Sequence, residues 1–192
     1  MTCIVAIVDA DTIWMGCDSY VGDDLTYVLL PPDETKVFKL PLRCIGEPHE
    51  TLIFGYAGSI RAGQIIKYNL ELPVYDAELG VTDMEYLINE MIPCIRQIHK
   101  KNGLLVDDDG IQSSEACFIV GWRKKLYYIE EDYGVVPVST NHLALGSGQH
   151  IAHGALASGL TDTPTVRIER ALAAAQKSTN HVREPFYIQH TL

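Results

Sequence analysis

The sequence predicts an α+β fold in which two antiparallel β-sheets are stacked and each outer face carries a pair of helices. Apolar β-type segments come in adjacent pairs joined by short turns, as in hairpins. The helical patterns also come in pairs, and these pairs alternate with groups of strands rather than with single strands. Such grouping is typical of α+β layers and argues against a doubly wound parallel sheet. We therefore expect a four-layer αββα sandwich.

Length and composition favour one globular domain over residues 1–192. The chain has 192 residues, of which 47% are apolar and 21% charged. No apolar stretch reaches the ~20 residues needed to span a bilayer, and no secretory leader pattern is present, so we expect a cytoplasmic protein with no membrane role. The net charge of −10 argues against nucleic acid as a partner, because its phosphates are bound by Lys and Arg.

The first half of the chain predicts strands followed by two helices. Residues 20–35 are polar and rich in proline, which predicts a loop. Apolar residues at helical spacing predict helices over 59–70 and 82–101. The second of these begins with the capping box Thr82–Glu85, and Pro93 predicts a kink within it. The predicted strands are residues 3–8, 12–17, 36–40 and 51–56.

The second half repeats this order. Gly146-Ser147-Gly148 leads into a predicted helix of small residues over 149–159. Thr163-Pro164 supplies an N-cap with proline at the first helical position and predicts a helix that ends near Lys177. The predicted strands are residues 115–122, 125–131, 142–145 and 186–188.

Thr2 is the first candidate for chemistry. It stands directly before the apolar run 3–8, so removal of Met1 would leave a free α-amine at the end of a core strand. A threonine hydroxyl is a weak nucleophile, and an adjacent N-terminal amine is one of the few arrangements that activate it. Taken alone, Thr2 is better explained as the first ordered residue of an edge strand, because Met-Thr starts are common.

Four further residues stand where predicted strands end, which is where sites are usually built. Asp18 follows the second strand, and Lys36 opens the third. Gly58 and Ser147 each stand where a strand meets a helix. Each residue also has an ordinary structural explanation: an ion pair for Asp18 and Lys36, a turn for Gly58, and a helix cap for Ser147.

Taken in order, these residues resemble the proteasome β-type N-terminal nucleophile (Ntn) hydrolases, and bacterial HslV in particular. The resemblance implies that the four-layer sandwich is the Ntn-hydrolase fold. It also implies a threonine-type endopeptidase subunit, in a divergent bacterial or phage branch of these proteins. The segments that carry the resemblance are Thr2-Cys3-Ile4-Val5, Gly16-Cys17-Asp18, Lys36-Val37, Tyr56-Ala57-Gly58 and Leu145-Gly146-Ser147-Gly148.

The resemblance implies a catalytic role for each of these residues. Thr2 Oγ would attack a peptide carbonyl with its own α-amine as general base, since that amine has an unperturbed pKa of about 7.7 to 8.0. Lys36 would lower the pKa of the amine and of the hydroxyl, and Asp18 would pair with Lys36. The Gly58 N–H would be an oxyanion donor, and Ser147 would hydrogen-bond near the amine.

One stretch departs from the family pattern. Family members usually carry an acidic residue after the penultimate helix to support the terminal amine, and residues 176–181 contain none. Ser178, Asn180 and Ser19 are the candidates to replace it. The resemblance requires no cofactor, although a monovalent cation held by backbone carbonyls is left open here. The segment 71–81 is an insertion relative to the HslV pattern. The resemblance therefore leaves open whether an AAA+ unfoldase docks to this chain.

Two other functions are compatible with the same residues. A retained Met1 would block the general base, which favours a catalytically silent scaffold or binding subunit of proteasome type. A small-molecule Ntn amidase is the third alternative, because a fold does not fix the substrate. Cys3 is a rival nucleophile, but strand alternation places it on the opposite face from Thr2, in the core. The spacing of the five cysteines indicates neither a disulfide framework nor a zinc site.

The resemblance also implies self-assembly. A peptidase that acts on peptides or unfolded proteins would be enclosed in rings of six or seven subunits, stacked in pairs, with Thr2 facing an inner chamber. We expect two apolar helix faces to pack against neighbouring subunits. Their members are Ile151, Ala152, Ala155 and Leu156 in one helix and Met84, Leu87, Ile88, Met91, Ile92 and Ile95 in the other.

Overall fold

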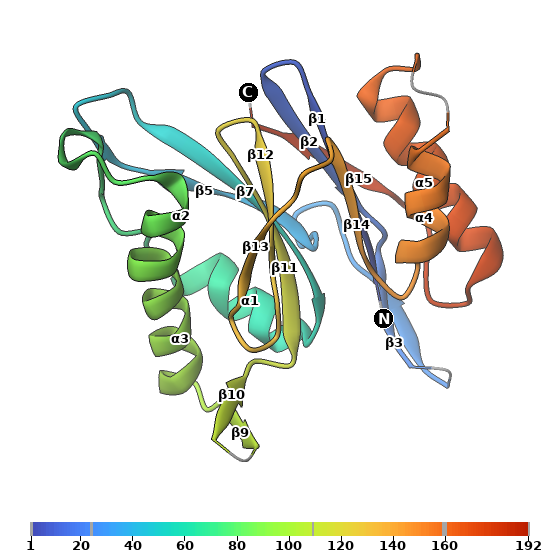
Figure 1. The fold of residues 1–192 in the computed structure, drawn as a ribbon. Helices are drawn as coiled ribbons and strands as arrows, with labels where there is room; N and C mark the ends of the chain where they lie inside the picture. Colours follow the sequence, from blue (N-terminus) through green and yellow to red (C-terminus); the bar gives the residue numbers. More distant parts are fainter. Residues whose placement is uncertain (1, 24, 109, 159–160, 192) are drawn as a thin grey trace.

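Two β-sheets lie face to face between two layers of helices, as Figure 1 shows. The computed structural model describes residues 2–23, 25–108, 110–158 and 161–191. Within these ranges one sheet has four strands and the other has five, and each sheet is antiparallel throughout. The predicted αββα sandwich is therefore confirmed.

The four-stranded sheet contains the start of the chain. Its order is β14-β1-β2-β15, in which β1 and β2 form the predicted hairpin. Cys3 at the start of β1 is paired with Gly146, and Cys17 at the end of β2 is paired with Tyr187. Four strand ends therefore meet at one edge of the sandwich. The strands are β1 (Cys3–Asp9), β2 (Thr12–Cys17), β14 (His142–Gly146) and β15 (Tyr187–His190).

The five-stranded sheet has the order β13-β12-β11-β7-β5. The predicted hairpin of β11 and β12 turns through Arg123 and Lys124, both at positive φ (49° and 61°). That geometry matches the right-handed twist of the strands it joins. The strand β13 is short and contains Pro137, so its residues show no clear strand pattern. The strands are β5 (Val37–Leu42), β7 (Glu50–Gly58), β11 (Ala116–Trp122), β12 (Lys125–Ile129) and β13 (Val135–Pro137).

β1 is buried on both of its faces, because alternate side chains of a strand point in opposite directions. Ile4 and Ala6 pack between the two sheets, against residues such as Ile53 of the facing sheet. Cys3 and Val5 point the other way and pack against the helices α4 (Gln149–Leu156) and α5 (Pro164–Ser178). This is why the sequence of the strand reads as a continuous apolar run.

The helices on the other sheet begin at side-chain caps, of which the Thr82–Glu85 capping box was predicted. Ser59 caps α1 (Ile60–Asn69), and the Thr82–Glu85 capping box opens α2 (Asp83–Tyr86). The kink expected at Pro93 is a π-helical segment, η2 (Leu87–Met91), in which the Ile92 N–H donates to the Leu87 carbonyl. Proline lacks an N–H and crowds the preceding turn, so a widened turn ahead of α3 (Ile92–Lys101) relieves both conflicts.

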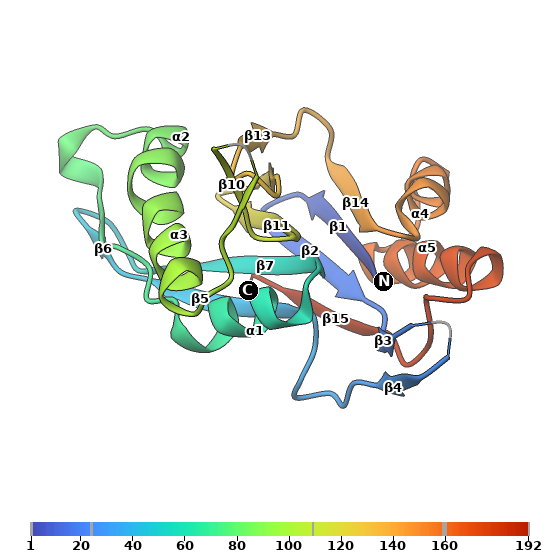
Figure 2. The same ribbon diagram turned by 90° about the horizontal axis from the view of Figure 1, so that it is seen from below.

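The prediction of a loop over residues 20–35 is in part wrong. It contains a hairpin of β3 (Tyr20–Gly22) and β4 (Tyr27–Leu29). The Asp23 carboxylate accepts hydrogen bonds from the N–H groups of Leu25 and Thr26, which fixes the turn. Strands of three residues around an acidic turn give too little periodicity to be recognised in the sequence. Figure 2 shows this hairpin beside the start of the chain.

The helix faces expected to mediate assembly are mostly used inside the subunit. Ile88 and Ile151 are exposed, at 48% and 38%, and Met84 and Ala155 are half-buried. The helices therefore need this apolar surface to cover their own sheets, and the prediction of two intersubunit faces was wrong in that respect. The buried members are Leu87, Met91, Ile92, Ile95, Ala152 and Leu156.

Several short elements complete the fold. β6 (Cys44–Ile45) pairs in parallel with β8 (Tyr75–Asp76), which is followed by the 3₁₀ helix η1 (Ala77–Leu79). A further hairpin is formed by β9 (Val106–Asp108) and β10 (Ile111–Ser113). Within the described ranges, no helix is long and apolar enough to cross a membrane.

Candidate active site

The predicted site residues gather where the strand ends of the two sheets meet. Thr2 precedes β1, Asp18 follows β2, and Ser147 follows β14. Gly58 ends β7 in the facing sheet. A Cβ placed on Gly146 would lie 3.3 Å from Cβ of Ala57, so the end of β7 adjoins the end of β14. The fold thus brings segments far apart in sequence to one edge.

Ser147 is bound to Thr2 by two hydrogen bonds. The Thr2 N–H donates to Ser147 Oγ at 3.3 Å, and the Ser147 hydroxyl donates to the Thr2 carbonyl at 3.2 Å. The N–H of Gly148 donates to the same carbonyl at 3.4 Å. A hydroxyl is therefore held at the nitrogen of Thr2, the atom that would become the α-amine.

Gly146 makes this approach possible. Its φ is +95°, and a Cβ there would lie only 2.2 Å from the Thr2 carbonyl oxygen. A side chain at this position would be strained and would push β1 away from β14. The glycine before Ser147 is thus required by the close contact with Thr2 and not only by a turn.

Asp18 and Lys36 form a buried ion pair. Lys36 Nζ lies 2.8 Å from Asp18 Oδ1, and both side chains are 0% exposed. Buried charges are tolerated only when they are paired and hydrogen-bonded. The predicted pairing of these two residues is present in the structure.

The Asp18 carboxylate also holds the backbone next to Thr2. Its Oδ1 accepts the Cys3 N–H at 2.9 Å, and its Oδ2 accepts the Tyr20 N–H at 2.9 Å. The Lys36 ammonium and the peptide nitrogen that follows Thr2 are therefore each less than 3 Å from the same oxygen. In the low dielectric of a buried site, this arrangement sets a strong local field beside Thr2.

Gly58 occupies the junction between β7 and α1. Its φ is +102°, and a Cβ there would lie 2.4 Å from the Glu115 carbonyl oxygen. The next N–H, that of Ser59, donates to this carbonyl at 2.9 Å. Gly58 is thus fixed in a conformation that side chains rarely adopt, and the oxyanion role of its N–H stays a prediction.

The three residues expected to support the terminal amine lie in different surroundings. Ser19 is buried, and both its N–H and its hydroxyl donate to the Arg183 carbonyl at 3.0 Å. Ser178 is exposed, and its hydroxyl donates to the Ala174 carbonyl of its own helix. Asn180 lines a hollow of about 600 Å³ beside the β3–β4 hairpin. Ser19 therefore connects the end of β2 to the segment before β15.

Cys3 packs in the core, as strand alternation predicted. It is 0% exposed, and burial together with the neighbouring Asp18 charge raises the pKa of its thiol to about 12. Burial likewise raises the pKa of Cys17 to about 12. Nucleophilic attack requires the thiolate, so neither cysteine competes with Thr2 in this structure.

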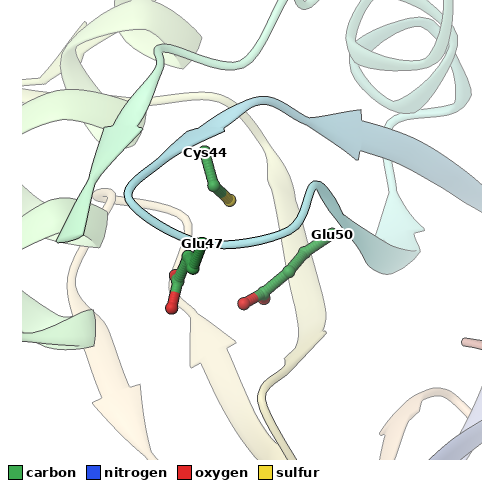
Figure 3. A group of neighbouring side chains, drawn as sticks. All are labelled: Cys44, Glu47 and Glu50. Atoms are coloured by element: carbon green, nitrogen blue, oxygen red, sulfur yellow. The ribbon is translucent and has the colours of Figure 1, made fainter.

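A cluster of possible metal ligands lies elsewhere, at the turn after β6. Figure 3 shows Cys44, Glu47 and Glu50, whose ligand atoms lie within 4.8 Å of one another in the described part of the chain. The Arg123 guanidinium forms ion pairs with both Glu47 and Glu50 and already supplies the positive charge there. Burial raises the pKa of the Cys44 thiol, which further disfavours a thiolate ligand. The cluster is an ion-pair network around Arg123.

The sequence did not predict the parts of the site that backbone groups supply. The N–H groups of Cys3 and Tyr20 and the Arg183 carbonyl carry no residue-type signature. Gly146 entered the sequence prediction only as part of a motif. A glycine at the end of a strand was the signal that could have predicted the close contact with Thr2.

No protein-family model matches the sequence, and no curated protein matches it. Among solved structures, the chain is similar to BPH from Thiobacillus denitrificans, with a TM-score of 0.72, 14% identity, and coverage of 99% of this chain and 97% of that one. Eukaryotic HslV from Trypanosoma brucei gives a TM-score of 0.62 at 15% identity, covering 98% of each chain. Anbu from Yersinia bercovieri, described as an ancestral beta-subunit, gives 0.67 at 15% identity, covering 99% of this chain and 82% of that one.

The chain has a proteasome-type Ntn-hydrolase fold. At these identities the similarity shows the fold alone, in a divergent form. The chemistry has to be argued from the site itself, because one fold supports many functions.

Proposed function

We propose that this chain is an N-terminal threonine peptidase with Thr2 as its nucleophile. The observation that carries the proposal is the set of contacts around the Thr2–Cys3 peptide. Ser147 binds the Thr2 nitrogen and carbonyl, while the buried Asp18–Lys36 pair binds the Cys3 nitrogen. A threonine that only begins a strand has no need of a buried ion pair beside it.

The mechanism we propose uses the Thr2 amine as general base. The amine accepts the proton of Thr2 Oγ as the oxygen attacks the carbonyl carbon of a peptide bond, and then delivers it to the departing amine. A water molecule next hydrolyses the acyl ester in the same way and regenerates the hydroxyl. The Lys36 ammonium would favour the neutral amine, because a nearby positive charge disfavours a second one. The Gly58 N–H is our candidate oxyanion donor.

This mechanism requires that Thr2 has a free amine. An acylated nitrogen is no base, so any residue before Thr2 must be removed. Met1 lies outside the residues that the structure describes. The proposal therefore includes a maturation step that exposes Thr2.

We further infer that the peptidase acts on peptides or unfolded proteins within a closed, stacked ring of six or seven copies in the cytoplasm. The β3–β4 hairpin beside the site carries exposed apolar side chains, with Leu25 95% and Val28 60% exposed. Apolar surface of this kind is usually covered by a partner. An AAA+ unfoldase is the candidate that would deliver substrates, and a monovalent cation near residues 176–181 is the candidate ion.

Covalent labelling tests the proposed nucleophile. A solved structure of Thiobacillus denitrificans BPH is described as a complex with epoxomicin, and BPH shares this fold. We expect epoxomicin to add once to a chain that begins at Thr2, as an increase in intact mass. The matched controls are the Thr2→Ala variant and a chain that keeps Met1, which we expect to stay unlabelled. Equal labelling of all three forms would remove Thr2 from the proposal.

A catalytically silent subunit is the second candidate, and the burial of Thr2 favours it. Thr2 is 1% exposed, so the residue is not open to a substrate in this conformation. If the chain is silent, a correctly processed form beginning at Thr2 will be folded and assembled but will neither be labelled nor hydrolyse peptides.

A further inference from the structure

The segment 71–81, which the sequence predicted to exceed the HslV pattern, lines a hollow of about 290 Å³ together with residues between 85 and 90. It lies between β8, η1 and the helical turns of α2 and η2. In Figures 1 and 2 the helix α2 lies on the far side of the five-stranded sheet from the chain start, so this hollow is separate from the candidate active site.

The walls of the hollow are fixed in the folded chain. The rings of Tyr75 and Tyr86 meet edge to face with centroids 5.4 Å apart. Their hydroxyls donate to the carbonyls of Val81 at 2.8 Å and Pro73 at 2.7 Å. A Cβ placed on Gly80 would meet nothing within 4 Å, so the mouth beside η1 is open. Binding sites are usually preformed in this way.

The lining is negatively charged. Asp76, Glu85 and Glu90 contribute carboxylates, and the lining residues that the structure describes include no Lys, Arg or His. The N–H and hydroxyl of Thr82 both donate to Glu85 at 2.8 Å, and these bonds lower the pKa of Glu85, which keeps it ionised at neutral pH. A carboxylate accepts about four hydrogen bonds, so the capping bonds of Asp76 and Glu85 leave acceptor capacity for a ligand.

The rim of the hollow is apolar. Leu79 is 72% exposed and Val74 is 41% exposed, and both line the opening. An aliphatic side chain of a ligand would cover these two residues while a cation reached the carboxylates. A free polyamine would satisfy the carboxylates but would leave Leu79 and Val74 in water.

We propose that this hollow is a docking site for a segment of a partner protein in which a Lys or Arg residue adjoins aliphatic residues. The carboxylates of the lining favour a cationic side chain of the partner, and the exposed apolar rim favours aliphatic side chains next to it. The volume is at the lower limit of the ~300–1,000 Å³ typical of ligand sites, which suits one or two side chains of a longer segment.

A labelled peptide tests the proposal on the full chain. The probe is fluorescein-labelled Leu-Lys-Leu-Lys-Leu-amide, and its charge-reversed counterpart is Leu-Glu-Leu-Glu-Leu-amide. We expect the anisotropy of the basic peptide to rise with a dissociation constant below about 1 mM. The affinity should fall as salt is added, because the charges are near the surface. The acidic peptide should not bind.

Two substitutions localise the binding. Glu90→Gln and Leu79→Ser change exposed side chains, and each should weaken binding by about threefold or more. The matched controls, Glu130→Gln and Val136→Ser, change exposed residues outside the hollow and should leave the affinity unchanged. Equal binding of the acidic peptide, no binding at about 1 mM, or equal losses in the control variants would each overturn the proposal.

Discussion

Replacing Lys36 with methionine removes the cation from a fully buried ion pair. The Lys36 ammonium lies 2.8 Å from Asp18 Oδ1, and neither side chain is exposed. Methionine keeps much of the apolar stem and removes the charge. The Asp18 carboxylate is then left with its bonds from the N–H groups of Cys3 and Tyr20. The substitution therefore measures what the ammonium contributes to the site.

Breaking a buried pair by removing one member typically costs about 3–5 kcal/mol. The two remaining N–H donors still stabilise Asp18, so we expect the lower end, about 3 kcal/mol. With a urea m-value of about 1–3 kcal/mol/M, the midpoint of unfolding should fall by at least ~1 M. Fluorescence of Trp14 and Trp122 during urea titration provides the measurement.

Lys39→Met is the matched control, because Lys39 lies in β5, which begins directly after Lys36, and is exposed. Its ammonium donates to the His190 carbonyl at the surface, and its loss should cost less than about 1 kcal/mol. Equal destabilisation by the two substitutions would refute the claim that the buried pair stabilises the site.

A double variant tests the other bonds of Asp18. If Asp18 served only Lys36, Lys36→Met with Asp18→Ala would recover stability, since no stranded charge would remain. The structure argues against recovery, because Asp18→Ala also leaves two buried N–H groups without their acceptor, at about 1–3 kcal/mol each. A double variant more stable than Lys36→Met would show that these N–H bonds contribute little.

Three further results are expected. Gly146→Ala should lower the free energy of unfolding by about 1–3 kcal/mol, because a Cβ would lie 2.2 Å from the Thr2 carbonyl oxygen. Gly154→Ala, which has open space around it, is the control that should not destabilise the fold, and equal effects of the two in urea titrations would contradict the close contact. Burial lowers the pKa of His99, so the unfolded chain binds a proton that the folded chain does not, and the free energy of unfolding should fall as the pH drops below about 6.5. Urea unfolding at pH 7 and at pH 5 should show this loss in the wild type and not in His99→Gln. Light scattering should give the mass of a closed oligomer, whereas a mass near the 21.3 kDa of one chain would contradict the ring.

The order of elements was predictable because hydrophobic periodicity and caps are local properties of the chain. The β1–β2 hairpin and the Thr82–Glu85 capping box both follow from neighbouring residues. The β3–β4 hairpin was missed because strands of three residues carry little periodicity. The helix faces were misassigned because composition shows that Leu87 and Ile95 are apolar but does not show how much of them the sheet covers.

The candidate site was predictable only in its side chains. Asp18, Lys36 and Ser147 stand at strand ends in the sequence, and the fold brings all three to the Thr2–Cys3 peptide. The bond of Asp18 to the Cys3 N–H could not be predicted, since it depends on how β1 lies relative to the end of β2. The bond to the Tyr20 N–H is a local turn across two residues. These bonds give Asp18 a positioning role that residue types alone do not reveal.

Hydrolysis of a peptide amide by three forms of the chain tests the central claim most directly. The forms are a chain that begins at Thr2, the same chain with Thr2→Ala, and the chain that keeps Met1. We expect the first to release the fluorophore from a panel of peptide amides, and the other two to be slower by at least ~10³-fold while keeping the same urea midpoint. Equal hydrolysis by the chain beginning at Thr2 and by its Thr2→Ala variant would contradict the claim that Thr2 is the nucleophile.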